Sequence, residues 1–230
     1  MRSIWRTLDR GLARDIGLVC LADCLVGVSY GAIAVSSGFP LWLPMLMSLL
    51  VFAGASQFMF IGIVAAGGNP FAAVLAGLLA NARHLPFGFA VGDAVGTRRS
   101  TRALGSHLMS DETVAFAMAQ DEAPRRRAAY WACGLGIFVF WNTGVLVGAY
   151  AGTAISDTDA FGLDAAFPAV LLALVLPSLR DKAARLPVLV GVVVALAATP
   201  FLPAGLPVLL ALAGVVVGVV AKEPEPQELR

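Results

Sequence analysis

Charged residues are scarce in this chain of 230 residues: they make up 13% of the sequence, whereas hydrophobic residues make up 59%. Soluble domains carry about 25% charged residues, so this composition excludes an ordinary soluble protein. The formal net charge is only +1, which gives no reason to expect a nucleic-acid partner. The charges gather between long apolar segments, as they do in the loops of a membrane protein that crosses the bilayer several times.

Residues for catalysis and metal binding are also few, with two histidines and three cysteines. The sequence has no Gly-x-x-x-x-Gly-Lys-Ser/Thr loop, no His-Glu-x-x-His and no Gly-x-Ser-x-Gly. The cysteines Cys20, Cys24 and Cys133 lie in apolar segments, where a metal or redox pair is one interpretation and small buried hydrophobes are the favoured one. We therefore expect no enzyme activity, no metal and no cofactor.

Seven strongly apolar segments predict an all-α, polytopic membrane protein with seven to eight transmembrane segments, because a helix of roughly 20 residues crosses the hydrocarbon core. They cover residues 15–37, 41–66, 70–93, 128–153, 163–179, 186–202 and 205–221. We expect a single transmembrane domain over 1–221 and a disordered cytoplasmic tail over 222–230. The arginines that recur every fourth residue before the first segment suggest a short basic helix on the membrane surface.

Basic clusters predict the orientation, because Lys and Arg gather in cytoplasmic loops. The N-terminal arginines, Arg125–Arg127 and Arg180–Arg185 should all be cytoplasmic, with both termini. Three spans before Arg125 would break this rule, so we favour an eighth crossing over residues 103–120. That choice leaves three arginines on the outer face: Arg98, Arg99 and Arg102. The alternative is that one early segment is re-entrant and residues 103–120 lie at the interface.

A faint internal repeat is consistent with eight crossings. Gly27-Val-Ser-Tyr-Gly-Ala-Ile-Ala34 resembles Gly144-Val-Leu-Val-Gly-Ala-Tyr-Ala151, which suggests repeat halves over 1–120 and 121–221, although chance is an alternative. Glycines four residues apart in both copies, and Gly214 with Gly218, predict seams where helices pack closely.

The candidate site begins with Asn81-Ala-Arg83-His84-Leu-Pro86, inside the third apolar segment. An arginine within the membrane costs on the order of 3 kcal/mol, so its presence suggests a path for a polar substrate or ion. Pro86 has no N–H, so we expect the carbonyl of Ala82 to lose its helical partner and the helix to break there.

On one helix, four of these residues would form a single stripe: Gly77, Asn81, His84 and Gly88. Asn81 and His84 would then face a neighbouring helix or a cavity. Interhelical hydrogen bonds that only hold the fold together are the alternative.

Further polar residues lie in other apolar segments. Asp111 and Glu112 would be adjacent carboxylates suited to proton coupling if their segment crosses the membrane, and solvated acids if it does not. Asp23 in the first segment either neutralises Arg83 or belongs to the transport path. Gln57 can bind a substrate or bridge two helices.

Four motifs together resemble the AzlC family and do so in the same order. They are Phe52-Ala-Gly-Ala-Ser-Gln-Phe58, Asn81-Ala-Arg-His84, His107-Leu-Met-Ser-Asp-Glu-Thr113 and Gly162-Leu-Asp-Ala-Ala-Phe-Pro168. The resemblance runs from about Gly11 to Leu179. The Leu-Pro-Phe that follows His84 departs from the family, in which we expect a nearby aromatic residue and no fixed proline.

The resemblance implies the large subunit of a bacterial exporter that moves leucine, isoleucine, valine and methionine across the inner membrane. It also implies a proton gradient as the energy source and a small AzlD-like membrane subunit as the partner. In this hypothesis Arg83, helped by Asn81 or Gln57, binds the substrate carboxylate. Asp111, Glu112 or Asp23 takes the ammonium group or the coupling proton. A membrane scaffold and a membrane-embedded enzyme are the competing hypotheses.

Overall fold

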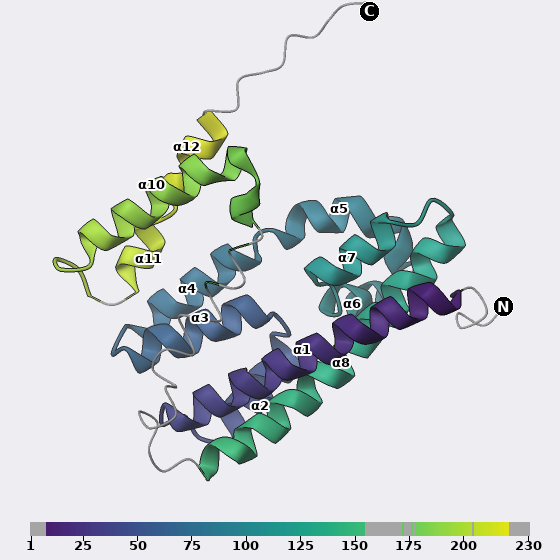
Figure 1. Ribbon diagram of the computed structural model, residues 1–230, viewed down its shortest axis with the longest axis horizontal. Helices are drawn as coiled ribbons and strands as arrows, with labels where there is room; N and C mark the ends of the chain where they lie inside the picture. Colours follow the sequence, from purple (N-terminus) through teal and green to yellow (C-terminus); the bar gives the residue numbers. More distant parts are fainter. Residues whose placement is uncertain (1–7, 155–171, 173–175, 177, 204, 221–230) are drawn as a thin grey trace, which may run out of the picture. The chain divides into compact units, whose positions relative to one another are not determined.

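The computed structural model describes residues 8–154, 172, 176, 178–203 and 205–220, and these residues form helices and no strand (Figure 1). The predicted all-α class is therefore confirmed. The chain divides into two compact units, unit 1 with residues 1–58 and 78–163, and unit 2 with residues 59–77 and 164–230.

Helices α1 (Arg10–Ser36) and α8 (Ala123–Thr153) are both long and apolar enough to cross a membrane. Helices α4 (Pro70–Asn81) and α5 (His84–Val95) pass this test only together, as a bent pair. The predicted broken helix is thus present, whereas the described residues do not confirm the predicted number of seven to eight spans.

The first span has no separate surface helix among its described residues. Asp9 is the N-cap of α1, and its carboxylate accepts a hydrogen bond from the Leu12 N–H at 2.8 Å. That bond, followed by the Arg125 guanidinium, lowers the pKa of the Asp9 carboxyl. Arg10 and Arg14 therefore belong to the first turns of α1 and not to a separate basic helix, whereas the earlier part of the expected basic helix, residues 1–7, lies outside the described residues.

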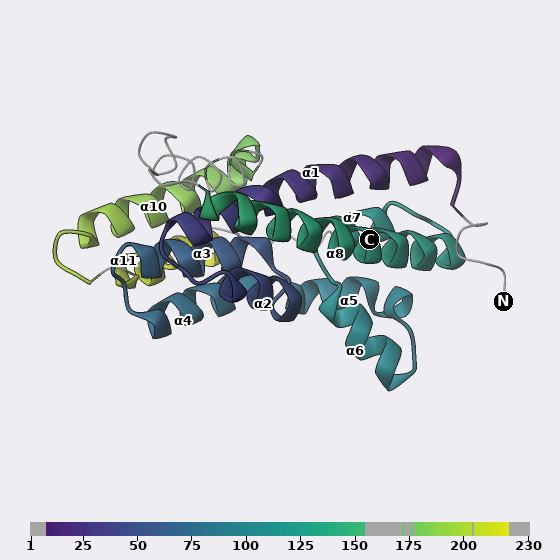
Figure 2. The ribbon, with the colours of Figure 1, turned by 90° about the horizontal axis from the view of Figure 1, so that it is seen from below.

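Helices α1 and α8 pack against each other in parallel through their glycines. A Cβ placed on a glycine of α8 would collide with the α1 backbone at successive positions, which pair Gly144 with Cys24, Gly148 with Val28 and Gly152 with Ala32. Both residue numbers rise together, so the helices run in the same direction, as Figure 2 also shows. The predicted seam is confirmed, and the two similar segments of the faint repeat lie on either side of it.

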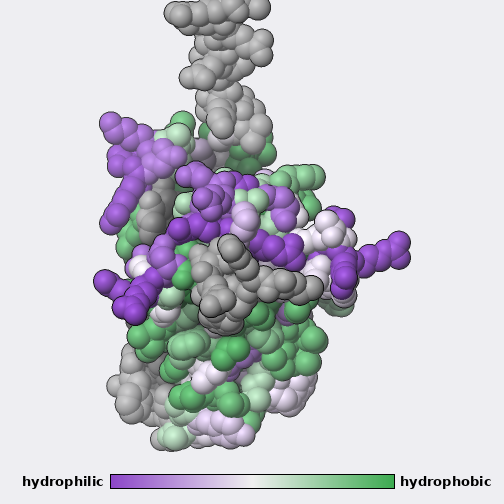
Figure 3. Space-filling model, turned by 90° about the vertical axis from the view of Figure 1, so that its right-hand side faces the viewer, coloured by the Kyte–Doolittle hydropathy of each residue, from purple (hydrophilic) through white to green (hydrophobic). Residues whose placement is uncertain are grey.

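The N-termini of α1 and α8 meet at one end of unit 1, which we name the basic end after its arginines: Arg10, Arg14, Arg125, Arg126 and Arg127. The Arg125 guanidinium and the Asp9 carboxylate form an ion pair at 2.6 Å across these two N-termini. Figure 3 faces this side of the molecule and shows hydrophilic side chains gathered here.

The second apolar segment is two helices and not the single predicted one. Helix α2 (Trp42–Leu50) ends before Phe52, whose φ of 41° lies in the left-handed region that non-glycine residues rarely adopt, and α3 (Gly54–Ala65) follows. The Met47 carbonyl at this corner accepts the Val51 N–H at 2.8 Å.

Unit 2 contains the 3₁₀ turn η3 (Ser178–Arg180), α10 (Lys182–Ala198), α11 (Leu206–Leu210) and α12 (Ala213–Val220). A Cβ on Gly214 would collide with the Pro187 carbonyl of α10, so the predicted seam on α12 is confirmed. Leu209 packs against a small core formed by Ile63, Ala73 and Ala76. The predicted tail and most of the predicted segment 163–179 lie outside the described residues.

Candidate functional site

The helix break lies between Asn81, which ends α4, and His84, which begins α5. The Ala82 N–H donates to the Leu79 carbonyl, and the Ala82 carbonyl accepts the Leu85 N–H, both at 3.1 Å. The expectation of a free Ala82 carbonyl was therefore wrong. The break also precedes Pro86, which sits in the first turn of α5, where a missing N–H removes no intrahelical hydrogen bond.

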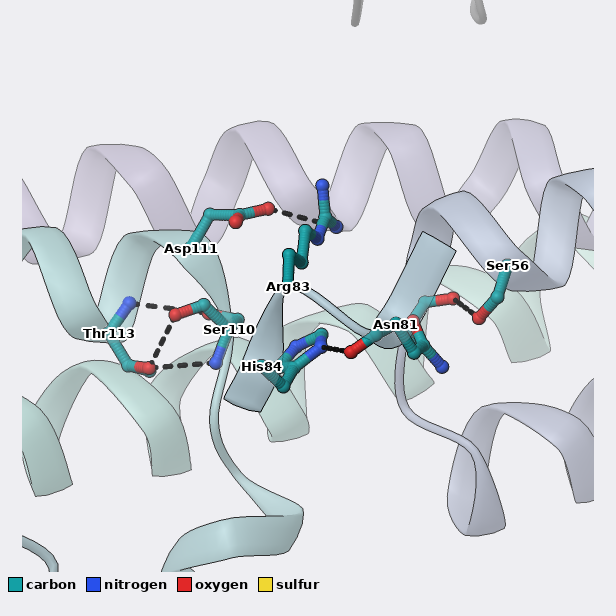
Figure 4. A network of polar contacts seen from close by, with 8 residues as sticks. Ser56, Asn81, Arg83, His84, Ser110, Asp111 and Thr113 are labelled. Carbon is teal, nitrogen blue, oxygen red and sulfur yellow. Dashed lines mark hydrogen bonds and ion pairs between the residues drawn. The ribbon is translucent and has the colours of Figure 1, made fainter. Parts of the chain in front are cut away.

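Arg83 stands in this break and forms an ion pair with Asp111 at 2.9 Å (Figure 4). Its partner is thus Asp111, and not the Asp23 that we considered. The two side chains remain 43% and 42% exposed. A pair this accessible can exchange its partners for the charged groups of a ligand, because exposed ion pairs are worth only about 0–1 kcal/mol in water.

Asp111 and Glu112 occupy the first turn of α7 (Asp111–Met118), where carboxylates interact favourably with the helix dipole. Ser110 is the N-cap and forms a capping box with Thr113. The Ser110 N–H donates to Thr113 Oγ1 at 2.8 Å, and the Thr113 N–H donates to Ser110 Oγ at 3.3 Å. This box fixes the start of α7 and so holds Asp111 opposite Arg83.

Helices α6 (Arg99–His107) and α7 form a hairpin that enters unit 1 from the basic end and returns to it. At 1.5 Å per residue these helices are about 12–14 Å long, less than half of a hydrocarbon core of about 30 Å. At the turn, the His107 ring lies 5.8 Å from the Phe138 ring of α8. After α7, Gln120 Oε1 accepts a hydrogen bond from Arg125 Nε at 3.2 Å, which places that end of the hairpin at the basic end.

The end of α5 also lies at the basic end. Asp93 forms an ion pair with Arg126 at 3.3 Å, and a Cβ on Gly96 would come within 3.0 Å of Arg127 Nη2. The favoured crossing over residues 103–120 was therefore wrong, as was the placement of Arg98, Arg99 and Arg102 on the face opposite Arg127. The chain needs no crossing there because both ends of the hairpin lie at the same end of unit 1.

The start of α7 packs beside an inner part of α8, away from both ends of that helix. A Cβ on Gly134 would contact Leu108 and Thr113, and Gly134 lies eleven positions after Ala123, the first residue of α8. Eleven residues of helix measure about 17 Å, out of about 46 Å for the whole of α8. We call this position along α8, away from both of its ends, the interior level of unit 1. The Arg83–Asp111 pair lies at this level.

His84 and Asn81 contact each other across the break. The His84 Nδ1 lies 2.9 Å from the Asn81 backbone carbonyl, and because a carbonyl only accepts, Nδ1 carries the hydrogen. Whenever the ring is neutral, its Nε2 is then an acceptor. The Asn81 side-chain Oδ1 is buried and accepts no hydrogen bond within the described part of the chain.

Asn81 and His84 line a cavity of about 410 Å³ in unit 1. Its other lining residues are Leu85, Gly88, Phe89, Gly92, Val95, Arg102, Ser106 and Met109. The break interrupts the predicted stripe, yet Asn81, His84 and Gly88 still share this cavity. Arg83 and Asp111 do not line it: Figure 4 shows Arg83 reaching toward Asp111 while the His84 ring turns back toward Asn81.

Gln57 and Asp23 are placed apart from this cavity. Gln57 is fully buried and its Nε2 donates to the Met47 carbonyl at 3.1 Å, so it stabilises the corner between α2 and α3. Asp23 lies on α1, and its buried Oδ2 has no hydrogen-bond partner among the described residues.

Sequence reasoning missed seven of the ten residues that line the cavity, three of them from α6 and the turn after it, and one polar contact. Arg102, Ser106 and Met109 line the cavity, and Ser48 Oγ donates to Asn142 Oδ1 at 2.6 Å to join α2 to α8. The spacing of Arg102 and Ser106 by four residues was a signal for a shared helix face. A serine such as Ser48 in an apolar helix carries no comparable signal.

Comparison with known proteins shows to which family the chain belongs. The family model described as AzlC protein matches residues 19–155. The chain belongs to the AzlC family. The family is related to branched-chain amino-acid transport and its relatives are membrane proteins, which bears out the transport and membrane character expected from the sequence.

Three relatives illustrate this membership. An uncharacterized membrane protein of Archaeoglobus fulgidus is 30% identical, over 80% of this chain and 81% of its own length. The inner membrane protein YgaZ of Escherichia coli is 29% identical, over 64% of this chain and 65% of its own length. The branched-chain amino acid transport protein AzlC of Bacillus subtilis is 35% identical, over 30% of this chain and 27% of its own length. No solved structure matches the chain.

Proposed function

We propose that this AzlC-family protein exports leucine, isoleucine, valine and methionine across the inner membrane. The observation that carries the proposal is the Arg83–Asp111 ion pair, which stands in a helix break at the interior level of unit 1. Broken helices near the membrane midplane are where many transporters bind their substrates.

A zwitterionic amino acid suits this pair because it carries both charges. Its carboxylate replaces Asp111 on the Arg83 guanidinium, which offers a fork of N–H donors. Its ammonium group then takes the place of Arg83 on Asp111. The half-exposed state of both side chains supports such an exchange, since neither is sealed by the fold. Asn81 and His84, on either side of Arg83, hold the break in shape.

Asp23 and Glu112 supply the coupling proton in this proposal. Asp23 lies on α1 with its Oδ2 buried and without a hydrogen-bond partner in the described part of the chain, and Glu112 lies in the first turn of α7. In this proposal the two carboxylates hold one proton between them and release it when water reaches them. The neighbouring positions of Asp111 and Glu112 on α7 connect substrate binding with proton release.

The basic end faces the cytoplasm in this proposal, because arginines gather on the cytoplasmic side of inner-membrane proteins. Both termini are then cytoplasmic. The hairpin of α6 and α7 dips into the membrane from the cytoplasmic side. A small AzlD-like membrane subunit works with this chain, as the family resemblance implies.

Efflux of leucine from loaded cells tests the assignment. We expect Arg83→Ala and Asp111→Asn to lower efflux about ten- to hundredfold, because a hydrogen bond to a charged group is worth about 1.5–3 kcal/mol. Arg83→Lys should keep part of the activity, since it keeps the charge but not the fork.

Arg126→Ala is the matched control, because it removes a different arginine–aspartate pair, the one that joins α5 to α8, and touches no proposed substrate group. It should leave efflux unchanged. If Arg83→Ala and Asp111→Asn insert normally and export at the unmutated rate, the proposed roles are wrong.

A further inference from the structure

A groove runs beside α5 from the helix break toward the basic end. Its α5 wall consists of His84, Gly88, Gly92 and Val95, at spacings of four, four and three, which form one face of the helix. The eleven helical steps from His84 to Val95 span about 17 Å. The opposite wall consists of residues from α6 and the turn after it: Arg102, Ser106 and Met109.

The two glycines of this groove are not explained by helix packing. A Cβ built on Gly88 or Gly92 would meet no atom within 4 Å, whereas a Cβ on Gly144 or Gly148 would collide with the α1 backbone. Neither Gly88 nor Gly92 has a positive φ. A glycine inside a helix costs about 1 kcal/mol relative to alanine, so both lower helix stability without a packing reason among the described residues. Their effect is to leave open volume in the groove.

The groove is polar at the break and apolar along its walls. At the break, Asn81 Oδ1 is a buried acceptor without a donor in the described residues, and His84 Nε2 is a second acceptor whenever the ring is neutral. Such acceptors fit an ammonium group. The walls beyond are lined by Leu85, Phe89 and Met109, and Arg102 lies one turn from Ser106 toward the basic end. Its volume of about 410 Å³ falls within the range of about 300–1,000 Å³ for small-molecule pockets.

We propose that this groove is the access site where a branched-chain amino acid binds before it reaches the Arg83–Asp111 pair. The polar end of the amino acid lies at the break beside Asn81 and His84, and its branched side chain points along α5 toward the space left by Gly88 and Gly92. Arg102, at the mouth, attracts the carboxylate as the amino acid enters. The inference rests on the proposed function and deepens it, because it makes Gly88 and Gly92 the residues that set the size of the accepted side chain.

Inside-out membrane vesicles test the access site by comparing uptake of leucine and valine. The vesicles come from cells that express the full chain together with the small subunit. Gly88→Leu fills the groove, so we expect the kcat/KM of leucine to fall about tenfold relative to that of valine, which is one methylene smaller. Gly88→Ala and Gly92→Ala should shift the same ratio in the same direction by less.

Gly17→Leu is the matched control, because Gly17 is also helical and a Cβ there would meet no atom, but it lies on α1 outside the groove. It should leave the ratio unchanged. The inference is overturned if the wild type transports both amino acids and the Gly88 and Gly92 variants keep its ratio. A uniform loss for both amino acids with loss of the co-purified small subunit also overturns it, because the groove would then be a helix-docking face. If the wild type takes up neither, the proposed function fails as well.

Discussion

Asp93 in the last turn of α5 and Arg126 in the first turn of α8 form an ion pair at 3.3 Å. The Trp131 indole N–H donates to the Ala94 carbonyl at 3.2 Å beside it. Together these contacts hold the end of α5 at the basic end, next to the start of α8. The segment between them therefore begins and ends at one end of unit 1, and its two short helices make no net crossing.

This arrangement predicts that the loop after α5 and the loop before α8 face the same side of the membrane. Cysteines at Ser100 and Asp121, both exposed positions, should react with an impermeant maleimide from the same side. The unmodified chain is the control for background, since Cys20 and Cys133 are buried. Labelling of the two positions from opposite sides would instead show that residues 103–120 cross the membrane.

The α1–α8 seam predicts a large loss of stability on substitution of Gly148. A leucine there would push its Cβ into the Val28 carbonyl, which is backbone and cannot move aside. We expect Gly148→Leu to destabilise the protein by about 1–3 kcal/mol or to prevent assembly. Thermal unfolding in detergent measures the effect, with Gly17→Leu as the control that adds the same side chain to an open position. Equal melting temperatures for the two variants would contradict the seam.

The sequence predicted the parts of this fold that depend on composition and local pattern. Apolar length identified α1 and α8, and glycines at spacing four identified the packing face of each helix, because both are properties of contiguous residues. That these two faces pack against each other was not predicted. The break near Arg83 was also predicted. Its position was shifted toward Pro86, because a proline in the first turn of a helix starts that helix and does not end the preceding one.

The parts that failed depend on contacts between distant residues. Basic clusters alone could not decide between a crossing and a hairpin, and the deciding contacts join Asp93 to Arg126 and Gln120 to Arg125. The partner of Arg83 was open for the same reason, since several carboxylates were available in the sequence. The signal that places Asp111 is the Ser110–Thr113 capping box, which marks a helix start and not the middle of a span.

The capping box predicts a measurable contribution of Ser110 to stability. Ser110→Ala removes the acceptor of the Thr113 N–H, and we expect a loss of about 1 kcal/mol in the free energy of unfolding. Because the start of α7 positions Asp111, efflux should fall as well. Ser100→Ala, at an exposed site in α6, is the control in the same thermal and efflux measurements. A Ser110→Ala protein as stable and as active as the Ser100→Ala protein would show that the box positions nothing.

The proposed role of Asp23 as a carrier of the coupling proton predicts that coupling and substrate binding can be separated by mutation. Asp23→Asn keeps the shape of the side chain but cannot release a proton, so uptake driven by a pH gradient in inside-out vesicles should be lost. Exchange of labelled for unlabelled leucine without a gradient should persist, because the Arg83–Asp111 pair is intact. Asp15→Asn, at an exposed position of the same helix, should keep both activities. Gradient-driven uptake that survives in Asp23→Asn would remove Asp23 from the proton path, and loss of both activities would place it in the substrate path instead.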